Sequence, residues 1–133
     1  VTIIDDSYNA SPVSMKAGIE VLSSMAGVKR RIAVLADMKE LGPDTITYHR
    51  EVGAFLKHQP IDQLVLMGEL AWELETGLKM DGGKISCVKT STLEETETWL
   101  AEAVREGDCL LFKGSNSMGL SKAVSFMREK LTN

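Results

Sequence analysis

The sequence predicts an α/β domain in which helices cover both faces of an open, mainly parallel sheet of five or six strands. Five short runs rich in Val, Ile and Leu recur along the chain, and they are apolar throughout rather than alternating. Strands that are covered on both faces show this pattern. A segment with helical periodicity follows each run, and such alternation of strand and helix is typical of a parallel sheet.

The first elements follow from apolar runs and capping signals. The helix after the first strand should begin behind Ser11, an N-cap candidate that precedes Pro12 at the first helical position, and Gly27 should end it. The second helix is expected over residues 45–58, because Pro60 follows it. The predicted strands span residues 1–5, 31–36, 63–67, 85–89 and 109–113.

The remaining helices are justified by the same signals. The third is expected over residues 69–78, before a turn at 81–83 that contains two glycines. The fourth should begin at Ser91, because Glu94 three residues later completes a capping box. The last should begin near Ser117, where apolar residues recur at helical spacing.

Length and composition indicate one cytoplasmic globular domain. The 133 residues suit a single domain, and the 44% of hydrophobic residues exclude disorder as the main state. A net charge of −4 argues against nucleic acid or an anionic membrane as the main partner. No apolar run approaches the ~20 residues that a membrane span needs. We expect Cys87 and Cys109 to be reduced and buried, as suits the cytoplasm.

Polar residues crowd the loop after the first predicted strand. Asp5 and Asp6 stand at the strand end, and Tyr8, Asn9 and Ser11 precede the first helix. In open parallel sheets, ligands bind outside the carboxyl ends of the strands, where helix N-termini favour anions. Adjacent acids at such a place can bind a metal or accept hydrogen bonds from sugar hydroxyls. Capping alone explains Ser11, but the whole loop holds more polar groups than capping needs.

The loops after the second and fifth strands extend this pattern. Asp37 ends the second strand, and Glu40 follows in a loop that is equally consistent with a solvated turn. Lys113 ends the fifth strand, and a glycine, Ser115 and Asn116 follow it. A lysine, a glycine for close backbone approach, and hydroxyl and amide groups at a helix start form a cradle for a carboxylate or phosphate. An N-capped helix beside a lysine that reaches solvent is the alternative.

Several catalytic and nucleotide-binding patterns are absent from the sequence. It has neither a G-x-G-x-x-G fingerprint nor a G-x-x-x-x-G-K-[ST] P-loop. His49 and His58 have no partner at metal-ligand spacing, so we predict no metal site and expect both at the surface. No serine–histidine–acid set can be argued, and no catalytic residue is assigned.

A receiver domain of a signalling protein is an alternative from another functional class. It has the same alternating plan, with paired acids after the first strand and a lysine that ends the fifth, as Asp5, Asp6 and Lys113 do here. Such a domain also needs a phosphate-accepting aspartate at the end of its third strand. This chain has Met67 and Gly68 there, which ranks the receiver interpretation low.

Four segments together carry a resemblance to a known family. Positions 5–15 read DDSYNASPVSM, close to the signature D-D-S/A-Y-N-A-N/S-P-x-S-M. Positions 34–42 read VLADMKELG, similar to V-L-G/A-D-M-x-E-L-G, and positions 48–53 read YHREVG, similar to the H-x-E-V-G that follows. Positions 112–118 read FKGSNSM, similar to V-K-G-S-R/N-x-M. In this order they resemble the C-terminal domain of Mur ligases, specifically of the members that add D-alanyl-D-alanine, over essentially the whole chain.

The resemblance implies a fold and an activity. Residues 1–133 would form one Rossmann-like domain, inactive alone, of a three-domain ligase whose UDP-sugar domain and central P-loop ATPase domain lie outside this chain. The start at Val1, without a methionine and inside a strand-like run, fits an excised domain. The enzyme would use ATP and Mg²⁺, bound mainly by the central domain, to join D-Ala-D-Ala to UDP-N-acetylmuramoyl-tripeptide in peptidoglycan synthesis. The C-terminal domain of a folylpolyglutamate-type ligase is a further alternative.

The resemblance also implies roles for residues on the nucleotide side. Asp6 matches the acid that contacts the ATP ribose in this family, and Tyr8 and Asn9 match residues on the nucleotide and phosphate side of the cleft. Asp37 and Glu40 would line the same cleft, with no specific role implied.

On the substrate side, the resemblance implies that Lys113, Ser115 and Asn116 line the D-Ala-D-Ala site. The dipeptide carboxylate would lie at the N-terminus of the last helix, in agreement with the anion cradle deduced from the residues. Asn116 stands where many relatives carry arginine.

Overall fold

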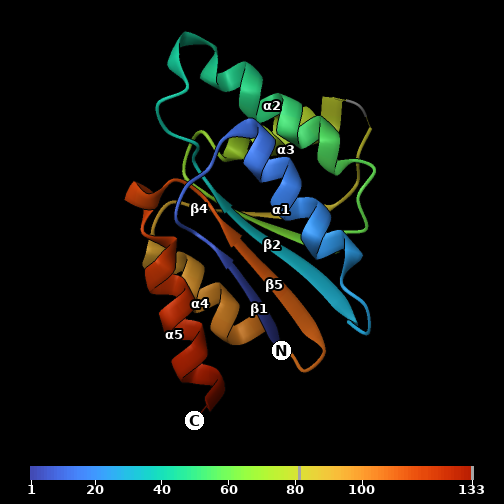
Figure 1. Cartoon of the computed structure of the whole chain (residues 1–133), viewed down its shortest axis with the longest axis vertical. Helices are drawn as coiled ribbons and strands as arrows, with labels where there is room; N and C mark the ends of the chain where they lie inside the picture. The colour runs from blue at the N-terminus through green and yellow to red at the C-terminus, as the bar shows by residue number, and fades with distance from the viewer. Residues whose placement is uncertain (81, 133) are drawn as a thin grey trace.

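The computed structural model describes residues 1–80 and 82–132, so the first residue of the turn predicted at 81–83 lies outside the described residues. Within these residues, five strands alternate with five helices, as the sequence predicts (Figure 1). The strands are β1 (Thr2–Asp6), β2 (Arg30–Ala36), β3 (Gln63–Met67), β4 (Ser86–Thr90) and β5 (Asp108–Lys113). The helices are α1 (Pro12–Ser24), α2 (Thr45–Leu56), α3 (Trp72–Met80), α4 (Leu93–Ala103) and α5 (Leu120–Thr132), with 3₁₀ turns η1 (Gly42–Asp44) and η2 (Asn116–Met118).

The five strands form one parallel sheet in the order β1-β5-β2-β3-β4. The last strand in the sequence therefore lies between the first two. Lys113, at the end of β5, is in register with Asp6 of β1 on one side and with Leu35 of β2 on the other. This order brings the carboxyl ends of β1, β5 and β2 together.

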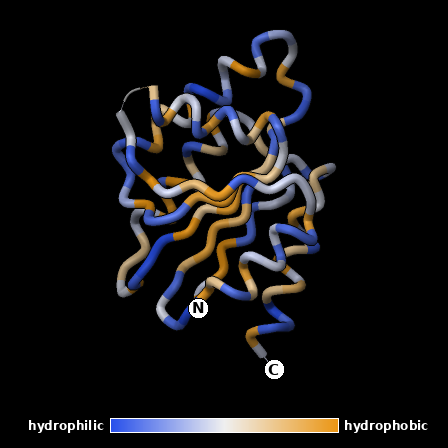
Figure 2. Tube along the Cα trace, turned by 180° about the vertical axis from the view of Figure 1, so that it is seen from behind, coloured by the Kyte–Doolittle hydropathy of each residue, from blue (hydrophilic) through white to orange (hydrophobic). Residues whose placement is uncertain are grey.

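Helices cover both faces of the sheet, which confirms the predicted fold class (Figure 1). Helices α1, α2 and α3 pack on one face, where Leu35 and Leu64 contribute to the core, and α4 and α5 pack on the other, where Val34 and Phe112 do. The strands form an apolar layer between the helices (Figure 2). All six residues of β5 are buried, which explains the unbroken apolar character of that run.

Helices α2 and α3 pack with their backbones in close contact because each carries a glycine at the interface. A Cβ on Gly53 would collide with the carbonyl of Leu74, and one on Gly77 would collide with the carbonyl of Arg50. The described part of the chain has no helix that is long and apolar enough to cross a membrane.

The helix boundaries confirm some capping predictions and correct others. Ser11 caps α1 as predicted, and its hydroxyl accepts a hydrogen bond from the backbone N–H of Ser14. Helix α4 is capped by Thr92 rather than Ser91, because the Thr92 hydroxyl is the one that accepts from the backbone of the third helical residue. Helix α5 begins at Leu120 rather than near residue 117, because η2 and Gly119, at φ 75°, intervene.

Candidate functional site

The loops after β1, β2 and β5 meet at one edge of the sheet, because these three strands are neighbours in it. They enclose a pocket of about 280 Å³. Six residues line it: Asn9, Lys39, Glu40, Ser115, Asn116 and Ser117. Four of the predicted site residues thus come together in one pocket, and Lys39 joins them although the sequence did not single it out. Three separate loops supply the lining, as is usual at this end of an open α/β sheet.

Lys113 lies beneath the loop between β1 and α1. Its side chain is only 2% exposed, and its ammonium contacts the Asp6 carboxylate at 2.9 Å and donates to the Asn9 carbonyl at 3.0 Å. Gly18 of α1 makes room for it, because a Cβ there would lie 3.0 Å from Lys113 Cδ. The lysine predicted for the substrate side therefore binds the loop predicted for the nucleotide side.

The β1–α1 loop presents polar and aromatic groups to solvent. Tyr8 is 81% exposed, and the carboxylate side chain of Asp6 remains about half exposed despite its ion pair. Hydrogen bonds within the loop fix its conformation. Asp5 accepts from the backbone N–H and the hydroxyl of Ser7, and the Asn9 side chain accepts from the backbone N–H of Ala10. The phenol ring and the Asp6 carboxylate are accessible to a ligand.

Asp37 lies below the pocket and joins three loops. It is 5% exposed, its Oδ1 accepts from the Ala71 N–H at 2.7 Å, and its carbonyl accepts from the Ser115 N–H at 3.0 Å. A Cβ on Gly68 would collide with this carboxylate, so the glycine at the end of β3 is required for the contact. Asp37 ties the ends of β2, β3 and β5 together, and Glu40 is the acid of this loop that lines the pocket.

His49 is fully buried, so the prediction that it lies at the surface is wrong. Its Nε2 accepts from the Met38 N–H at 3.0 Å, and its Nδ1 lies 2.7 Å from the Thr45 carbonyl. Because a carbonyl only accepts, Nδ1 carries the proton and the ring is neutral. Burial lowers the pKa of His49, against the opposing effects of the Thr45 carbonyl and the Asp37 charge.

The sequence contained a signal for this buried histidine. His49 precedes Val52 by three residues and Leu56 by seven, which is the spacing of the inward face of α2. The lack of a partner at metal-ligand spacing, from which the surface position was predicted, does not bear on burial. The ring fixes Met38, the residue before Lys39, so it shapes one wall of the pocket.

The described residues contain no group of three or more His, Cys, Asp or Glu side chains that could hold a metal ion. Cys109 is buried as expected, Cys87 is half-buried, and both are free thiols.

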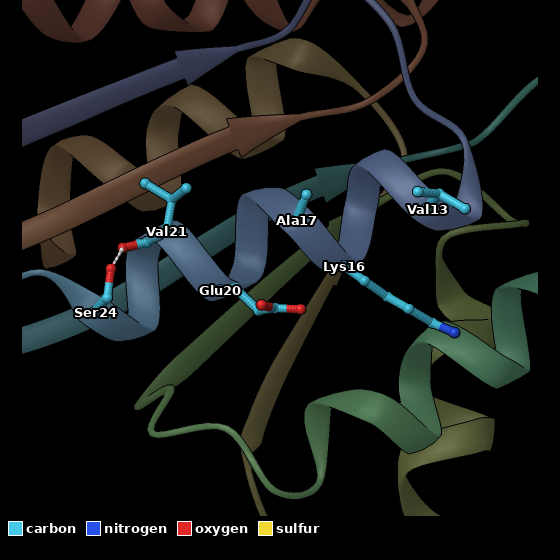
Figure 3. A pocket seen from close by; sticks show the side chains of 6 residues that line it. All are labelled: Val13, Lys16, Ala17, Glu20, Val21 and Ser24. Carbon is cyan, nitrogen blue, oxygen red and sulfur yellow. Dashed lines mark hydrogen bonds between the residues drawn. The ribbon is translucent and has the colours of Figure 1, made fainter.

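A wider hollow of about 590 Å³ runs along the outer face of α1 (Figure 3). Every residue that lines it belongs to this one helix. Its polar groups do not converge, and the Ser24 hydroxyl is already bonded to the Val21 carbonyl. The site at the strand ends is therefore the better candidate.

Comparison with known proteins identifies the family. A family model described as the glutamate ligase domain of Mur ligases matches residues 1–116. The chain belongs to the Mur ligase family. This assignment leaves the receiver interpretation without support, in agreement with Met67 and Gly68 at the end of β3.

Two curated relatives of this Mur ligase domain carry the same name. Proteins called UDP-N-acetylmuramoyl-tripeptide–D-alanyl-D-alanine ligase are 34% identical over 129 residues in Bacillus subtilis (strain 168) and 32% identical over 130 residues in Escherichia coli (strain K12). The matches cover 97% and 98% of this chain but 28% and 27% of those proteins. The chain thus spans little more than a quarter of the length of these relatives.

Solved structures of Mur ligases share the fold. The MurF ligase from Thermotoga maritima in complex with ADP matches with a TM-score of 0.76 and 28% identity, over 98% of this chain and 28% of that one. MurF from Acinetobacter baumannii matches with a TM-score of 0.83 and 27% identity, over 96% of this chain and 28% of that one.

Proposed function

We propose that this chain is the C-terminal domain of an ATP-dependent ligase that joins D-Ala-D-Ala to UDP-N-acetylmuramoyl-tripeptide in peptidoglycan synthesis. The observation that carries this proposal is the pocket at the ends of β1, β5 and β2, which is lined from the loops that hold the family motifs. The names of the relatives support the choice of this reaction over that of a folylpolyglutamate-type ligase. The enzyme would act in the cytoplasm, and the two free thiols agree with that location.

The proposed reaction runs in two steps. The terminal carboxylate of the tripeptide attacks the γ-phosphate of ATP, which yields an acyl phosphate and ADP. The amine of D-Ala-D-Ala then attacks the acyl carbon, and the tetrahedral intermediate collapses to an amide and inorganic phosphate. The C-terminal domain would bring the dipeptide to the acyl phosphate when it closes on the central domain, so its contribution is positioning.

The residues of the β1–α1 loop fit the nucleotide side. Asp6 has an accessible carboxylate that can accept from ribose hydroxyls, and Lys113 holds it in place. The exposed ring of Tyr8 can stack on the nucleotide, and Asn9 lies at the pocket where the phosphates would point. A complex of one MurF structure with ADP agrees with a nucleotide site. The described residues contain no cluster of metal ligands, and, as the family resemblance implies, Mg²⁺ would be bound mainly by the central domain.

The opposite wall fits the acceptor substrate. Ser115 and Asn116 line the pocket and would contact D-Ala-D-Ala, whereas Lys113 would act on that side only through the loop it holds. Asp37 would support this wall from below, because it bonds the backbones of Ala71 and Ser115.

Steady-state kinetics of the full-length parent enzyme test this function. We expect phosphate release from ATP to require both UDP-N-acetylmuramoyl-tripeptide and D-Ala-D-Ala, and we expect Tyr8→Ala to raise KM for ATP about tenfold by loss of base stacking. Tyr8→Phe keeps the ring and serves as the matched control, with KM for ATP near the wild-type value. Release that does not depend on the dipeptide would contradict the proposal.

A further inference from the structure

The pocket carries one charge of each sign. Lys39 and Glu40 are the charged residues among the six that line it. The other nearby lysine, Lys113, is 98% buried below the neighbouring loop and bonded to Asp6. Asn116, on the opposite wall, is neutral. A positive charge offered to a ligand in this pocket therefore comes from Lys39.

Three hydrogen bonds hold the backbone at and just before Lys39. Its N–H donates to the Ser115 hydroxyl at 2.7 Å, and the preceding N–H, that of Met38, donates to His49. One residue further back, the Asp37 carbonyl accepts from the Ser115 N–H. Glu40 follows with a left-handed φ of 62°, a conformation that costs a non-glycine residue about 1–2 kcal/mol. Such strain is found where a chain must present side chains at a site.

The side chain of Lys39, by contrast, is available. The side chain is 45% exposed, and within the described residues its ammonium makes one ion-pair contact, at 3.4 Å, with Asp37 Oδ2. An ammonium has three donors, and this contact is longer than a good charge-assisted hydrogen bond. At least two donors can therefore turn to a ligand while the buried Asp37 keeps the stem over the pocket.

We propose that Lys39 binds the C-terminal carboxylate of the acceptor dipeptide, with the Asn116 amide and the Ser117 hydroxyl as neutral partners. This assignment rests on the proposed function. A pocket with one lysine and one glutamate suits a zwitterion, and a dipeptide is one. The dipeptide carboxylate would pair with Lys39, and Glu40 would disfavour a second negative charge in the pocket. Lys39 is thus a specificity-determining residue that selects a free carboxyl terminus.

Kinetics with two acceptor substrates test the assignment in the full-length parent enzyme. The substrates are D-Ala-D-Ala and its C-terminal amide, which lacks the negative charge. We expect the wild type to prefer the acid, and Lys39→Met to raise KM for the acid about fivefold to tenfold, as befits a half-exposed ion pair. KM for the amide and kcat for both should stay near wild type. Lys39→Arg keeps the charge and should restore most of the preference.

A lysine outside the pocket provides the matched control. Lys57 is exposed at the far end of α2, and Lys57→Met should leave both KM values unchanged. Urea unfolding of each variant shows whether the fold is retained. If the parent enzyme does not use D-Ala-D-Ala at all, the proposed function fails. If it does, but Lys39→Met leaves the preference for acid over amide intact or raises both KM values equally, only the role of Lys39 is refuted.

Discussion

Lys113→Met and Asp6→Asn should destabilise the domain by unequal amounts, although both changes break the same ion pair. The two partners differ in burial, because the Lys113 side chain is 2% exposed and that of Asp6 is 46% exposed. Removal of the lysine leaves a carboxylate that water can reach. Asp6→Asn removes the counter-charge and leaves a buried ammonium among neutral acceptors, the new amide oxygen and the Asn9 carbonyl.

The magnitudes follow from this asymmetry. Breaking a buried pair so that a charge stays buried costs about 3–5 kcal/mol, and the remaining neutral acceptors, among them the Asn9 carbonyl, place Asp6→Asn near the lower end. Lys113→Met keeps the length of the side chain and removes the buried charge, so it loses a hydrogen bond and a half-exposed ion pair, together about 1 kcal/mol. The double variant should resemble Lys113→Met alone, because no charge is then left buried.

Urea unfolding of the chain measures these differences. The Arg50–Glu73 pair provides a control, because its side chains are 44% and 26% exposed, and Glu73→Gln should cost less than about 1 kcal/mol. A larger loss for Lys113→Met than for Asp6→Asn would refute the reasoning. So would a double variant as unstable as the sum of the single ones.

Two further predictions concern α2. The free energy of unfolding should fall as the pH drops below about 6.5, because burial lowers the pKa of His49, so that this side chain takes up a proton in the unfolded chain first. Urea unfolding between pH 7.5 and 5.5 should show a flatter pH dependence for His49→Gln than for the wild type. An unchanged slope would contradict this prediction. Gly53→Ala should destabilise the domain by about 1–3 kcal/mol, because its Cβ would collide with the Leu74 carbonyl. A urea midpoint equal to or above that of the wild type would show that α2 and α3 can move apart without loss of stability.

The fold class could be predicted because strands that are buried on both faces appear in the sequence as uninterrupted apolar runs. Residues 109–113 are apolar up to the lysine, and β5 is buried along its whole length. No such pattern indicates the order of the strands in the sheet. An apolar run shows that a strand is covered, but not which strands are its neighbours, so the position of β5 between β1 and β2 comes only from the structure.

The candidate site could be predicted in its composition but not in its geometry. Polar residues identify the loops that contain Asn9, Glu40 and Asn116, and these loops do meet at one pocket. Lys113 was expected at an anion cradle, yet it is buried, because β5 is an inner strand and Gly18 leaves room for its stem. The cradle itself is a 3₁₀ turn, because Gly119 adopts a left-handed conformation and delays the start of α5.

The polar residues of this site divide into two groups with different expected effects. Asp37, His49 and Lys113 are buried and bond to the backbones of the loops, whereas Tyr8 and Lys39 are exposed on those loops. Buried groups that fix the loop backbones support both walls of the pocket, so their loss should weaken binding of both the nucleotide and the acceptor. An exposed side chain contacts one ligand, so its loss should raise one KM. The proposed role, positioning by closure on a partner domain, needs both groups, because accurate positioning requires loops that are rigid before the ligand binds.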